Sequence, residues 1–311
     1  MSRRAPRNKS THDPRPATHA SSESIQGQVV ASFGRRYLVE LADAASLDCV
    51  TRGRRGVIAC GDRVSVAVRG PGQGVIEAVA PRTTLLYRSD QVRQKLVAAN
   101  VTQIVIVVAP LPAYHEELVN RCLAAAEHGG MAALIALNKS DLEQAPETLL
   151  ALERYRRLGY RVVALSAKRD LAPLAPHLKG QTSVLVGQSG VGKSTLINAL
   201  IPAASVRVAE LSAALDAGRH TTTHARLYHL DGASHIIDSP GMQEFGLHHL
   251  GQDGLEQAFI EFRPFLGQCR FRDCRHMTEP GCAVAVACER GKVSERRLAS
   301  YRGLVRERRE P

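Results

Sequence analysis

Two short motifs stand in an order that restricts how this chain can fold. Residues 186–195 read VGQSGVGKST, in which Gly187, Gly192, Lys193 and Ser194 match the phosphate-binding pattern G-x-x-x-x-G-K-[ST]. Residues 138–141 read NKSD, a pattern typical of guanine recognition. In the usual order of these motifs the phosphate-binding loop comes first, but here NKSD precedes it. Either one motif is accidental, or the chain runs through a known kind of domain in a permuted order.

The segments around both motifs alternate between strand and helix. Apolar runs begin at residues 103, 132, 161, 182 and 234, and helical patterns occupy residues 117–129, 146–159 and 193–201. Such alternation predicts a mostly parallel α/β sheet. NKSD, the tripeptide SAK at 166–168, the phosphate-binding loop and Asp238 each follow a strand, at the edge where open α/β sheets bind ligands. The motifs therefore belong to one site. Their order indicates circular permutation, which is tolerated because domain termini tend to lie close together at the surface.

The residue types at these positions predict a guanine nucleotide with Mg²⁺. The glycines let backbone N–H groups wrap the phosphates, Lys193 reaches the β- and γ-phosphates, and Ser194 binds Mg²⁺. The Asp141 carboxylate accepts the N1–H and 2-amino donors of guanine, a pair that adenine lacks. Asp238 in DSPG holds the Mg²⁺ shell, and the Gly241 N–H contacts a γ-phosphate.

Two further segments complete this expectation. SAK supplies a backbone N–H to the guanine O6 and an aliphatic stem against the ring. GRHTTTH at 218–224 offers a threonine hydroxyl to Mg²⁺ from Thr221, Thr222 or Thr223, of which Thr222 is assigned. The expected nucleotide-binding residues are Asn138, Lys139, Ser140, Asp141, Ser166, Ala167, Lys168, Gly187, Gln188, Ser189, Gly190, Val191, Gly192, Lys193, Ser194, Thr195 and Gly241.

The expected hydrolysis machinery is incomplete. Ras-type enzymes place Gln after the DxxG glycine to orient the attacking water, whereas this chain has Met242 there. Intrinsic hydrolysis is therefore expected to be slow and to need a partner. Lys193 and His220 are the candidate catalytic residues. His220 is either a water-positioning group or an exposed histidine on a mobile loop.

A cysteine and histidine cluster lies near the C-terminus. Cys269, Cys274, His276 and Cys282 follow the spacing C-x4-C-x-H-x5-C. Three thiolates and one imidazole form a closed set suited to one structural Zn²⁺ ion. The remaining cysteines (Cys49, Cys60, Cys122 and Cys288) lie outside this spacing.

The rest of the chain indicates a polyanionic partner and no membrane. Residues 1–24 read as a disordered basic arm. Short strand-like runs between residues 25 and 79, one of them GVIAC at 56–60, predict a small barrel of OB or SH3 type. A basic helix follows residue 293, with Arg296, Arg297, Arg302, Arg306, Arg308 and Arg309 around it. The net charge of +11 with 4% aromatic residues favours phosphate contacts over base stacking. No apolar run is long enough for a membrane span, and we expect a cytoplasmic protein.

These motifs together resemble the bacterial ribosome small-subunit-dependent GTPase A family (RsgA/YjeQ). The resemblance covers roughly residues 25–305 and implies an OB-type barrel at 25–84, a circularly permuted P-loop G domain at 85–250 and a zinc-binding helical domain at 251–311. It also implies a GTPase that acts late in assembly of the 30S ribosomal subunit, binds its 16S rRNA in the GTP state and leaves in the GDP state. His220 matches the catalytic histidine proposed for that family. We expect a monomer.

Two other functions remain open at this point. A GTP-controlled binding module would need no turnover. A DNA-associated metalloprotein would use the cysteine cluster as a finger, but the short x5 gap leaves no room for a recognition helix between the ligand pairs.

Overall fold

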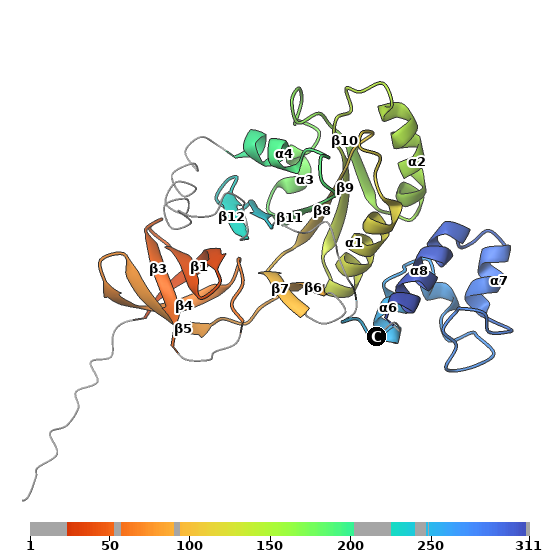
Figure 1. The fold of residues 1–311 in the computed structure, drawn as a ribbon, viewed down its shortest axis with the longest axis horizontal. Coiled ribbons are helices and arrows are strands. Elements are labelled where there is room, and N and C mark those ends of the chain that lie inside the picture. The colour runs from red at the N-terminus through yellow and green to blue at the C-terminus, as the bar shows by residue number, and fades with distance from the viewer. Residues whose placement is uncertain are drawn as a thin grey trace, which may run out of the picture.

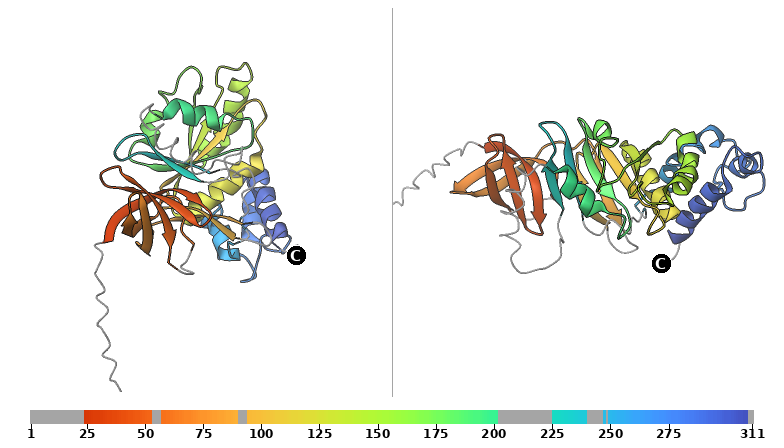
Figure 2. Two further views of the ribbon diagram at one scale, coloured as in Figure 1. Left: turned by 60° about the vertical axis from the view of Figure 1, so that its left-hand side comes forward. Right: turned by 90° about the horizontal axis from the view of Figure 1, so that it is seen from above.

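A computed structural model describes residues 24–52, 57–89, 94–201, 225–239, 247 and 249–308 of the chain. Figure 1 shows three parts: a β-barrel, a central sheet flanked by helices, and a group of C-terminal helices. In the second view of Figure 2 the three parts lie in a row, with the central sheet in the middle. This arrangement confirms the predicted fold class.

The barrel contains five strands in a closed order. They are β1 (Ser24–Phe33), β2 (Arg36–Leu41), β3 (Ser46–Thr51), β4 (Arg63–Gly70) and β5 (Gln73–Val79). The order is β1-β2-β3-β5-β4, and β1 also pairs with β4. The β3–β5 pair is parallel and the others are antiparallel. This is the topology of an OB-type barrel. Its core is apolar, with Val29, Val39, Leu47 and Ile76 buried.

The predicted strand at 56–60 is wrong. The third barrel strand is β3, in which Leu47 and Cys49 are buried while Asp48 hydrogen-bonds to Arg36 on the neighbouring strand. Residues 57–59 lie outside the strands, and Cys60 bridges to Ala98. The interstrand pairing of β3 with β2 and β5 outweighs the weak strand signal of its own sequence.

A hairpin and two side-chain bridges attach the barrel to the rest of the chain. The hairpin consists of β6 (Leu85–Ser89) and β7 (Gln94–Ala99). Asp62 is fully buried and receives two hydrogen bonds of 2.7 Å from Arg82. The Asn100 side chain accepts from the Thr83 N–H and donates to the Gly61 carbonyl. These bonds fix Gly61 and Asp62 against the residues that flank the hairpin.

The central sheet is built on five parallel strands. They are β8 (Gln103–Val108), β9 (Ala132–Leu137), β10 (Arg161–Ala164), β11 (Thr182–Val186) and β13 (His235–Asp238), and β12 (Arg226–His229) pairs antiparallel with β13. Their order is β10-β9-β8-β11-β13-β12. One residue pair, Ala31 with Arg226, joins β12 to β1, so that the barrel and the central sheet form one eleven-stranded sheet.

Helices cover both faces of the central sheet. They are α1 (Glu116–Gly129), α2 (Ala145–Arg157), α3 (Ala175–Leu178) and α4 (Lys193–Leu200). In β8, Ile104 and Ile106 belong to the same core as α1 and α2, whereas Val105 and Val107 pack with α3 and α4. A strand buried on both faces accounts for the continuous apolar run in the sequence.

The first and the last of the C-terminal helices pack against α1. The C-terminal helices are α6 (Gln252–Gln257), the 3-10 helix η2 (Arg263–Phe265), α7 (Ala283–Glu289) and α8 (Glu295–Glu307). Their apolar side chains join the core that lies beneath α1. Within the described parts of the chain, no helix is both long and apolar enough to cross a bilayer.

One expectation for the basic helix is wrong. Arg297 does not lie on the surface of α8 but is 2% exposed and paired with Glu261. A run of arginines does not reveal which of them faces a buried carboxylate.

Candidate functional site

Four of the predicted motifs meet at one edge of the central sheet. NKSD follows β9, SAK follows β10, the phosphate-binding loop follows β11, and Asp238 ends β13. Because these strands are parallel, their carboxyl ends lie at the same edge. Segments that are far apart in the sequence therefore surround one space, as the circular permutation requires.

Asn138 ties three of these segments together. Its side chain is buried, donates to the Val191 carbonyl at 2.9 Å and accepts from the Ala167 N–H at 2.9 Å. A Cβ on Gly192 would lie 2.4 Å from Nδ2 of Asn138, so that only glycine fits there. The NKSD asparagine thus fixes the position of SAK relative to the phosphate-binding loop.

A cavity of about 260 Å³ opens beside Asn138. Its lining residues are Leu111, Asn138, Lys139, Asp141, Leu142, Ser166, Ala167, Lys168, Gly192 and Thr195. All but Leu111 and Leu142 were expected from the sequence to contact the nucleotide. Nothing in the local sequence marks Leu111. Only the strand order, which places β8 between β9 and β11, could have indicated it.

The Asp141 carboxylate lines this cavity and can act there as a hydrogen-bond acceptor. A hydrogen bond with the Ser166 hydroxyl, which is the largest contribution, lowers the pKa of Asp141. Arg169 lies 3.5 Å from its Oδ2. The carboxylate is ionised at neutral pH and can accept two N–H donors from one ring edge.

The phosphate-binding loop has the backbone that its glycines allow. Gly190 and Gly192 have φ angles of 80° and 96°, which favour glycine. A Cβ on Gly187 would lie 2.3 Å from the Val107 carbonyl oxygen. The Lys193 ammonium is folded back onto the carbonyls of Gly187 and Gln188, at 2.6 and 2.9 Å.

Two opposite charges lie at the inner end of this loop. Burial lowers the pKa of Lys193 and raises the pKa of Asp238, although each charge favours ionisation of the other. Desolvation therefore outweighs their attraction. Ser194 and Thr195 are exposed in the first turn of α4.

Several predicted residues lie outside the described part of the chain. These are His220, Thr221, Thr222, Thr223, Gly241 and Met242.

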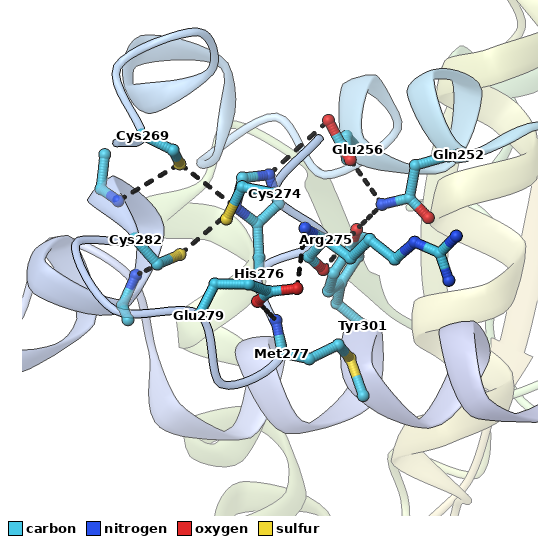
Figure 3. Close-up of polar contacts among 12 residues, drawn as sticks. Gln252, Glu256, Cys269, Cys274, Arg275, His276, Met277, Glu279, Cys282 and Tyr301 are labelled. Atoms are coloured by element: carbon cyan, nitrogen blue, oxygen red, sulfur yellow. Dashed lines mark hydrogen bonds and ion pairs between the residues drawn. The ribbon is translucent and has the colours of Figure 1, made fainter. Parts of the chain in front are cut away.

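The cysteine cluster converges as its spacing predicts. Single ligand atoms of Cys269, Cys274, His276 and Cys282 all lie within 4.8 Å of one another (Figure 3). Nδ1 of His276 is 3.6, 3.7 and 3.3 Å from the three sulfur atoms, in chain order. The N–H groups of Ala283 and Ala285 point at two of the sulfurs. This set could hold one metal ion, and protein atoms fill all four ligand positions.

The surroundings of His276 orient its ring. Oε2 of Glu256 lies 3.6 Å from Nε2, the ring nitrogen that faces away from the cysteines (Figure 3). A carboxylate at this position favours the tautomer that leaves Nδ1 free to bind a metal. His276 has a φ of 59°, and its carbonyl accepts a 2.9 Å hydrogen bond from Arg302 of α8.

A family model for the RsgA GTPase matches residues 79–248. The chain belongs to this family. The match spans more than half of the chain and includes NKSD, SAK, the phosphate-binding loop and DSPG.

Similar proteins match nearly the whole chain. A small ribosomal subunit biogenesis GTPase RsgA from Nitrosospira multiformis is 52% identical over 286 residues, 92% of this chain and 91% of that protein. Its counterpart from Nitrosomonas europaea is 53% identical over 287 residues, 91% of each chain. Among solved structures, YjeQ from Thermotoga maritima superposes with a TM-score of 0.72 at 31% identity, covering 93% of this chain and 99% of that one. YloQ, a circularly permuted GTPase, superposes with a TM-score of 0.69 at 27% identity, covering 95% and 99%.

Proposed function

We propose that this member of the RsgA family hydrolyses GTP to GDP and phosphate as an assembly factor of the small ribosomal subunit. The observation that carries the proposal is the Asn138 junction, where guanine-recognition residues and the phosphate-binding loop share one buried side chain. The small ribosomal subunit appears in the names of relatives that match about nine-tenths of this chain.

The nucleotide is proposed to bind along the sheet edge. Asp141 accepts the guanine N1–H and 2-amino groups, while SAK borders the base. Lys193 leaves the Gly187 and Gln188 carbonyls to contact the β- and γ-phosphates, because an anion offers this desolvated ammonium a stronger partner.

Residues at the phosphate end would hold Mg²⁺ with the nucleotide. Ser194 and Asp238 are the described candidates, and Thr222 is the candidate from the threonine run. The raised pKa of Asp238 fits a buried carboxylate whose charge a cation would stabilise. Bound Mg²⁺ would neutralise charge that develops on the phosphates. His220 is proposed to position the attacking water, and Gly241 to contact the γ-phosphate.

The metal of the cysteine cluster is proposed to be one structural Zn²⁺ ion. Around a tetrahedral ion with Zn–S of about 2.3 Å and Zn–N of about 2.0 Å, ligand atoms are roughly 3.5–3.8 Å apart. The Nδ1–Sγ distances of 3.3 to 3.7 Å agree with this geometry.

The ribosomal partner is proposed to be the 30S subunit, contacted through its 16S rRNA. The net charge of +11 favours a polyanion. The C-terminal part exposes several cations that could contact phosphates, namely Arg270, Arg272, Arg275, Arg290, Lys292, Arg296 and Arg306. We propose a cytoplasmic monomer with three domains bounded at residues 25–84, 85–250 and 251–311.

GTP turnover tests this proposal directly. Purified protein is assayed alone, with 30S subunits, and with 50S subunits as the control. We expect slow turnover that only 30S subunits stimulate. Binding of guanine nucleotides without stimulated turnover would make the protein a binding switch and would contradict the proposed activity.

A further inference from the structure

The loop at residues 109–115 lies between the two halves of the nucleotide site. It follows β8, which is placed between β9 with its NKSD and β11 with the phosphate-binding loop. The loop then enters α1 at Glu116. No sequence motif identifies this loop, and its position follows only from the strand order.

Hydrogen bonds fasten the loop to both motifs. Nζ of Lys139 donates to the Leu111 carbonyl at 2.6 Å and to the Gly190 carbonyl at 2.8 Å. The Gln188 side chain forms two bonds: Nε2 donates to the Ala113 carbonyl at 2.8 Å, and Oε1 accepts from the His115 N–H at 2.9 Å. One lysine of NKSD and one glutamine of the phosphate-binding loop therefore set the position of the loop.

The Leu111 side chain lines the cavity beside Asp141 and is nonetheless 51% exposed. Of the large apolar side chains that are exposed in the described part of the chain, it alone borders this cavity. The other exposed ones include Leu150 on α2, which is 71% exposed. An apolar side chain that is half open to water at a concave site is stabilised when the flat face of a ligand covers it.

We propose that Leu111 packs against the purine ring of the bound nucleotide, and that Gln188 is the positioning residue that holds Leu111 there. The proposal rests on the proposed guanine-nucleotide site and adds a contact that its motifs do not contain. Asp141 recognises one edge of the base, whereas Leu111 contributes affinity through a face. The contribution of Leu111 to the binding free energy should therefore be the same for purine bases that carry different groups on their edge.

The first test compares Leu111→Ala with wild type, with Leu150→Ala as the matched control for loss of an exposed leucine. Alanine keeps the backbone carbonyl that accepts from Lys139. A fluorescent GDP analogue reports the Kd and the dissociation rate. We expect Leu111→Ala to raise the Kd about three- to tenfold through faster dissociation. This factor corresponds to the free energy gained by burying about half of a leucine side chain. Leu150→Ala should equal wild type, and Leu111→Met should restore most of the affinity.

A second measurement separates the affinity that comes from contact with the face of the ring from the affinity that comes from hydrogen bonds to its edge. In an Asp141→Asn background, xanthosine diphosphate replaces GDP as the ligand, because an amide can donate to the additional carbonyl of xanthine. Leu111→Ala should weaken binding of this nucleotide by the same factor. A loss restricted to GDP would overturn the proposed ring contact.

The role of Gln188 requires a double-mutant cycle. If Gln188 acts through Leu111, then Gln188→Ala alone weakens binding, but Gln188→Ala combined with Leu111→Ala weakens it no more than Leu111→Ala does. Additive losses would overturn the role of Gln188. An unchanged Kd in folded Leu111→Ala would overturn the whole inference while leaving the nucleotide site intact. Failure of the wild type to bind GDP would instead contradict the proposed function.

Discussion

Arg297 and Glu261 form an ion pair that is almost completely removed from water. Nε of Arg297 lies 2.5 Å from Oε1 of Glu261, and the two side chains are 2% and 4% exposed. Nη1 of Arg297 donates to Oδ1 of Asn120 on α1 at 2.8 Å, and the guanidinium lies 4.3 Å from the Phe259 ring centroid. Asn120 also accepts from the Tyr155 hydroxyl of α2. The C-terminal part with the cysteine cluster is thus joined to the central sheet and its helices through buried polar contacts.

Replacing Arg297 with Ala should destabilise the protein by about 3–5 kcal/mol, because Glu261 would remain buried without its partner. Urea unfolding measures the free energy. Arg296→Ala is the matched control, since that neighbouring side chain is 71% exposed and its pair with Glu116 contributes about 0–1 kcal/mol. Equal effects of the two substitutions would contradict the buried pairing.

Replacing Asn138 with Ala should lower both stability and nucleotide affinity. The Val191 carbonyl and the Ala167 N–H would lose their partner, at about 1–3 kcal/mol for each group left unsatisfied. Thermal unfolding and the Kd for GDP are the measurements. Ser140→Ala in the same motif should leave the unfolding temperature unchanged, because the contact described for Ser140 is made by its backbone. An Asn138→Ala variant as stable as wild type would rule out the bracing role.

Cys282→Ser should release the metal, whereas Cys288→Ser should not. Both cysteines lie near α7, but only Cys282 belongs to the cluster. Elemental analysis of the purified variants gives the metal content per chain. Loss of the ion should also lower the unfolding temperature, because metal-binding energy contributes to folding. Metal loss in both variants, or in neither, would reject this ligand set.

Stability should fall in mildly acidic solution because of His235. Burial, with a smaller contribution from His229, lowers the pKa of His235. Nδ1 of His235 lies 2.9 Å from Nδ1 of His229, whose Nε2 is 2.7 Å from Glu40 of the barrel. Glu40 and Asp231 oppose the shift and Arg63 adds to it. A depressed folded pKa means that the unfolded chain binds more protons below about pH 6.5, so that stability is lost as the pH falls.

The test of this pH effect is unfolding in urea between pH 7.5 and 5. His235→Asn should reduce the slope of the unfolding free energy against pH by the equivalent of up to one bound proton. An unaltered slope in His235→Asn would show that other groups cause the acid sensitivity.

The sequence predicted those elements whose own residues carry a strong pattern. The run at 103–109 showed a strand because β8 is buried on both faces, and NKSD marked the end of β9. The strand β3 was missed because its stability comes from pairing with β2 and β5, which its own residues do not indicate. Burial of Arg297 depends on Glu261 and Asn120, which are distant in the sequence. Leu111 reaches the cavity because β8 also lies beside β11, a neighbour that the sequence alone does not indicate.

The permuted strand order also affects how the site forms during translation. Among the strands of the central sheet, β8, β9 and β10 leave the ribosome first, and these three strands are neighbours in the sheet. β11 pairs with β8 on one side and with β13, which is made later, on the other. Domains fold progressively as the chain emerges. A nascent chain that stops before residue 182 therefore holds the guanine-recognition residues but has no loop for the phosphates. Nucleotide binding can begin only after β11 has paired with β8 and brought the phosphate-binding loop beside NKSD.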